Sequence, residues 1–202
     1  MSNAFAGFIG VLLGASIGIL KDLFAYWAGR RRRGRYAAVR IICVLDQYVE
    51  KCVQVVSDDG TTQGQPGGRY SSGEEYLEAQ VRSPEPPTFP ADIDWTSLSP
   101  NLMYRVLELP NRAAETERFI LGATEHSFPP DFDDFFEARW EGYADLGLEA
   151  LGIAEELRRQ FKLPKSLIAI GNPDWNSTKF LQGKKAEVER LRKIEIAGEV
   201  AG

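Results

Sequence analysis

The hydrophobic pattern divides the chain into an uncharged N-terminal run and a longer part in which apolar residues recur at helical spacing. No charged side chain occurs between Met1 and Leu20. A membrane-spanning helix needs about 20 apolar residues, because each residue rises ~1.5 Å across a hydrocarbon core ~30 Å thick. A helix that continues past Lys21 to Trp27 is long enough, since lysine can extend its ammonium toward the headgroups. The pattern predicts a transmembrane anchor over residues 1–29.

The residues that follow the uncharged run predict the orientation of this anchor. Tyr26 and Trp27 are of the type that favours the headgroup interface. A basic collar over residues 30–35 comes next, with arginines at Arg30, Arg31, Arg32, Arg33 and Arg35. Positive charge beside a span stays on the cytoplasmic side and contacts anionic lipid headgroups. We therefore expect the N-terminus outside and the rest in the cytoplasm, in a bacterial inner membrane. A cleaved signal peptide is the weaker alternative, because its positive charge normally precedes its apolar region.

Small residues recur at every fourth position within the predicted anchor, at Ala6, Gly10, Gly14 and Gly18. Residues four apart lie on one face of a helix, and small side chains there let a second helix approach closely. This face predicts helix–helix packing with a second copy of the chain or with another transmembrane protein. Glycine is also common in membrane spans without any such role, and this remains the alternative.

Helical periodicity continues through residues 36–196, which we predict to be one α-helical cytoplasmic domain of about four helices followed by a tail over 197–202. A first helix over 36–56 either continues from the anchor or begins after it. Ser99 and Pro100 predict a helix start, and Pro110 a kink within that helix. Asp131 is the expected cap of the next helix, and Trp175 begins the last one. The expected inward positions are Val39, Ile42, Leu45, Val49, Cys52 and Val56; Leu102, Val106, Leu109, Ala113, Ile120 and Ala123; Phe132, Phe136, Trp140, Tyr143, Leu151, Ala154, Leu157 and Phe161; and Phe180, Leu181, Val188 and Leu191.

Between the first two of these helices, residues 57–98 are rich in glycine, serine and proline. A long segment without regular structure is uncommon inside a compact domain and is either a flexible excursion or a functional lid. We favour the flexible excursion, with one short helix over 74–81. We expect Ile93 and Trp95 to hold its end against the bundle.

Charge and cysteine content narrow the choice of partners. The net charge of the 202 residues is −5, and without the five collar arginines it is −10. An acidic body on a basic collar fits anionic lipid and predicts no nucleic-acid partner. Cys43 and Cys52 lie nine residues apart, on opposite faces of one helix and ~13 Å apart along its axis. They cannot form a disulfide with each other, and we interpret both as buried thiols in a reducing compartment.

The sequence contains no recognisable catalytic or cofactor motif. His126 is the only histidine, so a multi-histidine metal site is excluded, and its position at a helix end indicates a capping or surface residue. The acidic residues at 131, 133, 134 and 137 are explained by the dipole at a helix N-terminus and lack the pattern of a calcium loop. The side chains that could line a groove between helices are Tyr104, Arg105, Arg112, Arg118 and Arg139.

The leading hypothesis is therefore a membrane-anchored helical protein without identifiable enzymatic activity, which presents its bundle for protein–protein interaction or oligomeric assembly. A ligand-sensing or enzymatic domain with a site between the body helices, gated by residues 57–98, is the first alternative. A pore-forming or membrane-perturbing effector is the second alternative, because glycine repeats of this kind occur in pore-forming peptides.

Overall fold

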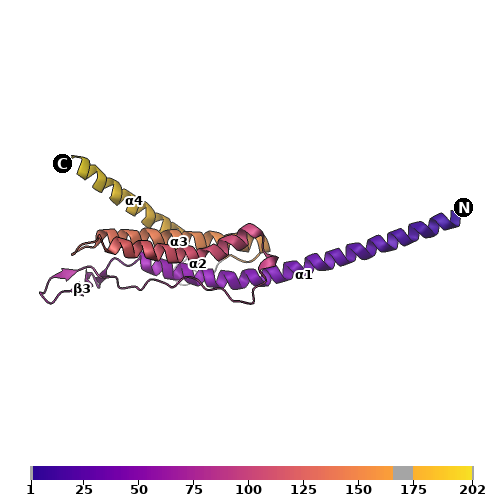
Figure 1. Cartoon of the computed structure of the whole chain (residues 1–202), viewed down its shortest axis with the longest axis horizontal. Coiled ribbons are helices and arrows are strands. Elements are labelled where there is room, and N and C mark those ends of the chain that lie inside the picture. The colour runs from indigo at the N-terminus through magenta and orange to yellow at the C-terminus, as the bar shows by residue number, and fades with distance from the viewer. Residues whose placement is uncertain (1, 166–174, 202) are drawn as a thin grey trace.

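The computed structural model describes the backbone of residues 2–165 and 175–201 and the side chains of residues 20–165, 175–194 and 197. Its helices are α1 (Ser2–Val56), α2 (Pro100–Thr124), α3 (Asp133–Phe161) and α4 (Ser177–Ala201). The expected all-α class is confirmed, since the strands within the described residues are only two residues long. Figure 1 shows α1, α2 and α3 side by side in a bundle, from which α1 extends as a single arm toward the N-terminus.

Helix α1 runs without interruption from the predicted anchor into the bundle, which answers a question that the sequence left open. Its 55 residues correspond to a length of about 80 Å. The face of small residues and most of the predicted anchor over residues 1–29 fall on residues 1–19, whose side chains lie outside the described part. Among the residues that are described, no helix contains a stretch both long and apolar enough to cross a membrane.

Helix α3 is the centre of the bundle and contacts the other three long helices. The part of α1 that packs against it buries most of its predicted stripe, with Val39 the exception at 44% exposure. The α2 stripe is also buried as predicted except for Ala123, which is half-buried. The side chains that fill the centre without exposure above 1% include Ile41, Leu45, Cys52, Val106, Leu109, Tyr143, Ala150, Ile153 and Leu157. Periodicity therefore located the buried faces of α1 and α2, but the predicted core omitted Ile41, Ala150 and Ile153.

Two predicted helix caps are wrong. Ser99 precedes α2 as expected, but its hydroxyl makes no capping hydrogen bond. Helix α3 begins after Phe132, which adopts a left-handed backbone conformation with φ 53°, and Asp131 does not cap it. The hydroxyl of Ser127 instead accepts a hydrogen bond of 2.7 Å from the backbone N–H of Phe135. A serine eight residues away thus satisfies one of the free amides at the start of α3.

The segment 57–98 lies along the bundle (Figure 1). It contains two small antiparallel pairs, β1 (Thr61–Thr62) with β2 (Gln65–Pro66) and β3 (Gly68–Arg69) with β4 (Glu75–Tyr76). The short helix predicted over 74–81 is wrong, because β4 occupies that region. A 3-10 helix η1 (Trp95–Ser97) ends the segment, where Ile93 is buried and Trp95 packs against the core as predicted.

Helix α4 packs against α3 through only part of its length. Leu181 and Val188 are buried, whereas Leu191 is 39% exposed, so its predicted inward position is wrong. The ammonium of Lys184 lies 3.9 Å from the ring centroid of Trp140 on α3, and Lys185 forms a 2.7 Å ion pair with Asp145. The preceding residues 166–174 lie outside the described part.

Candidate functional site

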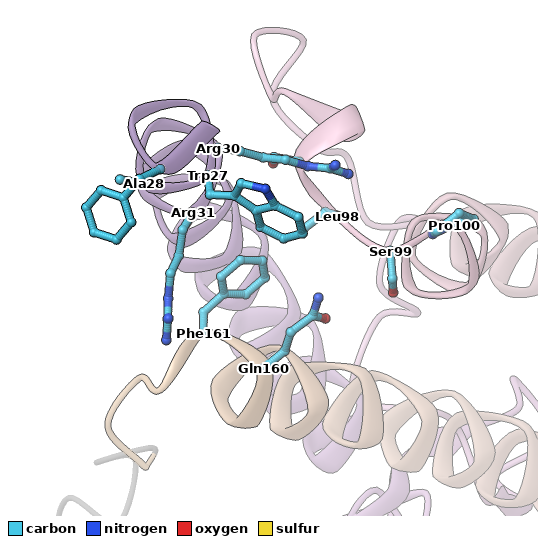
Figure 2. Close-up of a pocket in the computed structure, with 11 residues that line it drawn as sticks. Trp27, Ala28, Arg30, Arg31, Leu98, Ser99, Pro100, Gln160 and Phe161 are labelled. Carbon is cyan, nitrogen blue, oxygen red and sulfur yellow. The ribbon is translucent and has the colours of Figure 1, made fainter. Parts of the chain in front are cut away.

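A pocket lies where α1 leaves the bundle. Helix α2 begins there and α3 ends there, so η1, the start of α2 and the end of α3 lie beside about two turns of α1. The resulting pocket has a volume of about 690 Å³ and is lined by Phe24, Trp27, Ala28, Arg30, Arg31, Ser97, Leu98, Ser99, Pro100, Gln160 and Phe161. We call it the junction pocket. Figure 2 shows that the Trp27 and Phe161 rings both face this space, with Leu98 beside them.

The walls of the junction pocket combine aromatic surface with positive charge. Phe24 is 76% exposed and Trp27 is 62% exposed, whereas Phe161 and Leu98 belong to the buried core. Arg30 extends toward η1, and Arg31 extends along the side of Phe161 (Figure 2). None of the described residues that line the pocket is acidic. The pocket therefore combines exposed aromatic surface with a positive charge.

A close approach at Gly34 makes this geometry possible. A Cβ atom at this position would lie 2.5 Å from the Phe161 ring and 3.2 Å from the carbonyl oxygen of Ser97. Both distances are below ordinary van der Waals contact, so only glycine lets α1 lie this close to the end of α3 and to η1. In the sequence, Gly34 lies between the collar arginines Arg33 and Arg35. Its role depends on residues that the sequence does not place beside it.

The basic collar is partly engaged by the protein itself. Arg30 donates a 3.0 Å hydrogen bond to the carbonyl of Thr96, and Arg33 forms a 3.2 Å ion pair with Asp94. The hydrogen bond from the Thr96 hydroxyl and the Arg33 guanidinium together lower the pKa of Asp94. Arg31, Arg32 and Arg35 are exposed and form no ion pair with any described residue. Three collar arginines therefore remain available for an external anion.

A second cluster of polar groups forms around Asp58, at the start of the segment 57–98. The sequence did not predict it. The buried carboxylate of Asp58 accepts hydrogen bonds from the backbone N–H groups of Gly60, Gln80 and Val81. Arg139 on α3 lies 3.4 Å from this carboxylate and donates to Ser83 and to the carbonyl of Val81. Burial lowers the pKa of Arg139, against the attraction of Asp58. We call this group the Asp58 clasp; its bonds are internal, which indicates a structural role.

One turn of α3 beyond Arg139, side chains of α1 and α3 bring buried titratable groups together. The hydroxyl of Tyr143 donates a 2.6 Å hydrogen bond to Glu117 on α2. Burial raises the pKa of Cys52 to about 12 and also raises the pKa of Tyr48 and Tyr143. These groups stay protonated at neutral pH, so Cys52 is an inert thiol. Cys43 is exposed, which corrects the expectation that both thiols are buried.

The side chains proposed for a groove do not converge. Arg105 pairs with Glu156 and Arg112 with Glu149, whereas Arg139 belongs to the Asp58 clasp. Tyr104 is exposed and donates to Glu108. His126 is exposed as expected. Within the described residues, no three histidine, cysteine or acidic side chains are arranged to hold a metal ion.

Comparison with known proteins adds no relative from which a role can be transferred: no protein-family model, curated protein or solved structure matches this chain. The functional argument therefore depends on the geometry of the junction pocket, the collar and α1.

Proposed function

We propose that the chain is a single-pass membrane protein that holds its helical bundle at the cytoplasmic face of the membrane and presents it for protein–protein interaction or oligomeric assembly. In this proposal residues 1–29 span the bilayer and the collar contacts anionic headgroups. The N-terminus lies outside. The membrane is a bacterial inner membrane.

The observation that carries the proposal is the continuity of α1. The helix whose first part is the uncharged run is the same helix whose last part packs along α3 in the bundle core. No linker separates the two parts, so a tilt or rotation of the anchor reaches the bundle directly. A domain that only needed to stay near a membrane would be served equally well by a flexible tether.

The collar supports the proposed orientation. Arg31, Arg32 and Arg35 are exposed on α1 and form no ion pair with the residues that the structure describes; they lie directly beyond the aromatic residues Tyr26 and Trp27. Arginine within a turn or two of a span keeps that side of the protein in the cytoplasm. Each such side chain attracts an anionic membrane surface by about 1 kcal/mol.

Assembly through the face of small residues is tested by adding bulk to it. Gly14→Ile places a branched side chain on this face, and Ser16→Ile places the same side chain on the opposite face of the same helix turn. We expect Gly14→Ile to lower the oligomeric mass of the full chain in detergent, with Ser16→Ile retaining the mass of the wild type. Both variants should remain in carbonate-washed membranes. Unchanged mass in Gly14→Ile would remove the role of this face in assembly.

A further inference from the structure

We propose that the junction pocket binds one anionic phospholipid of the membrane that α1 enters. Its phosphate lies against Arg31, and the upper part of its acyl chains covers Phe24 and Trp27. This inference rests on the proposed membrane tether and goes beyond it. The tether requires only a general attraction between collar and headgroups, whereas the pocket selects and retains a single molecule.

The position of the pocket along α1 indicates a lipid. Phe24 and Trp27 follow Leu20, the last residue of the uncharged run, by four and seven residues. At ~1.5 Å per residue, Trp27 lies only about 10 Å beyond the end of that run. Residues 24–31 thus form the cytoplasmic end of the proposed span and the start of the collar, so the pocket opens at the depth of the headgroups. The molecules present there at the highest concentration are the lipids themselves.

The charge of the pocket indicates an anion. Arg30 and Arg31 both line it, and the nearby carboxylate of Asp94 is already occupied by Arg33 and by the hydroxyl of Thr96. Arg31 has no ion-pair partner among the described residues. The start of α2 adds the positive end of a helix dipole, and the Ser99 hydroxyl beside it is not used as a cap. Arg31 is therefore the expected ligand of a phosphate oxygen, while Arg30 and the start of α2 add positive potential on the other side of the pocket.

The aromatic wall distinguishes a phospholipid from a free phosphate ion. Phe24 and Trp27 expose large apolar surfaces beside the arginines. A small inorganic anion would satisfy the arginines and leave these rings uncovered, whereas acyl chains would cover them. The volume of about 690 Å³ lies within the usual ~300–1,000 Å³ of small-molecule sites. This volume suits a headgroup with the upper chain segments, and the remaining chain length would continue along α1 into the bilayer.

The test measures which lipid the full chain retains. The protein is reconstituted into nanodiscs of phosphatidylcholine and phosphatidylglycerol in equal amounts, released into a mild detergent, and analysed by native mass spectrometry. We expect one phosphatidylglycerol per chain, retained in preference to phosphatidylcholine. Arg31→Gln should lower this preference about tenfold or more, because a hydrogen bond between charged groups contributes at least ~1.5 kcal/mol and ~1.4 kcal/mol corresponds to tenfold. Ala28→Leu, which fills the pocket without changing charge, should also reduce retention.

Arg35→Gln is the matched control, because it removes the same charge from the same collar at a position that does not line the pocket. Its general attraction to the membrane surface no longer acts once the protein is released into detergent, so this variant should retain one phosphatidylglycerol per chain, as the wild type does. Equal losses in Arg31→Gln and Arg35→Gln would overturn the pocket and leave only general attraction by the collar. Displacement of the lipid by inorganic phosphate would show that the pocket recognises only the phosphate group. This result would also overturn the proposed lipid site. Failure of the tether is a separate outcome, detected as wild-type protein that carbonate extracts from the membrane.

Discussion

Removing Arg139 should destabilise the protein far more than removing an exposed arginine of equal charge. Arg139→Met keeps a long side chain on α3 but deletes the guanidinium. Its residue is 3% exposed, and its Nη2 atom lies 3.4 Å from Oδ2 of Asp58. The change also removes the hydrogen bonds to Ser83 and to the carbonyl of Val81. Asp58 is then a buried carboxylate without its cation.

The expected cost follows from what remains around Asp58. Breaking a buried ion pair by removing one partner typically costs ~3–5 kcal/mol, because an uncompensated charge stays in a poorly solvating environment. The backbone N–H groups of Gly60, Gln80 and Val81 still donate to the carboxylate, so we expect the lower end, about 3 kcal/mol. This is a large part of the ~5–15 kcal/mol that stabilises a typical domain. The pair of Arg112 and Glu149 is the control, since Arg112 is 45% exposed and its loss should cost about 1 kcal/mol or less.

Urea unfolding of the full chain in detergent micelles, followed by tryptophan fluorescence, measures both effects. The indole of Trp140 donates a 2.7 Å hydrogen bond to the carbonyl of Asp58, so this residue reports on the clasp directly. The double variant Asp58→Asn, Arg139→Met should recover at least ~1 kcal/mol relative to the sum of the single variants, because no buried charge is left unpaired. A cost for Arg139→Met no greater than that for Arg112→Met would refute the reasoning. So would strict additivity in the double variant.

Three further results are expected. Gly34→Leu should destabilise the protein by at least ~1–3 kcal/mol in the same assay, because its side chain would overlap the Phe161 ring; Gly122→Leu, at an open helix position, should be neutral or stabilising. Cys52 has an unfolded pKa near ~8.5 but a folded pKa of about 12, so the unfolded state loses its proton first and stability should fall as pH rises between these values. The Cys52→Ala variant should show a shallower fall in its thermal midpoint. Hydrogen exchange should be slow at the amides of Gln80 and Val81, which donate to Asp58, and fast near Gly64, an exposed turn position; uniform rapid exchange would contradict the Asp58 clasp.

The helices of this protein could be predicted from the sequence because the spacing of apolar residues within each helix is a local pattern. Apolar spacing of three and four residues located the buried faces of α1, α2 and α3, since each face repeats within one helix. The predicted inward position of Leu191 was wrong because a helical stripe does not show how far a partner helix extends beside it. The predicted cap of α3 was wrong for a related reason. The hydroxyl of Ser127, outside the first turn of α3, accepts the hydrogen bond from the Phe135 N–H, and no local rule identifies such a pair.

Only part of the candidate site could be predicted from the sequence. Trp27 and the collar arginines stood out by composition and position, so the positive and aromatic character of the region was predicted. Phe161 and Gly34 acquire their roles only when α3 returns to α1, a contact between residues more than a hundred positions apart. The similar lengths of α2 and α3 were the one available signal, because antiparallel helices of equal length bring the end of one near the start of the other. Asp58 and Arg139 offered no such signal.

The measurement that tests the central claim most directly is the side of the membrane on which Cys43 can be labelled. Cys43 is exposed on the bundle part of α1, and Cys52 is buried, so a membrane-impermeant maleimide has one native target in the folded chain. If α1 tethers the bundle to the cytoplasmic face, the reagent labels inside-out vesicles and leaves intact cells unlabelled, while the protein stays in carbonate-washed membranes. Labelling of Cys43 in intact cells would contradict the proposed orientation. Release of the protein by carbonate would contradict the tether itself.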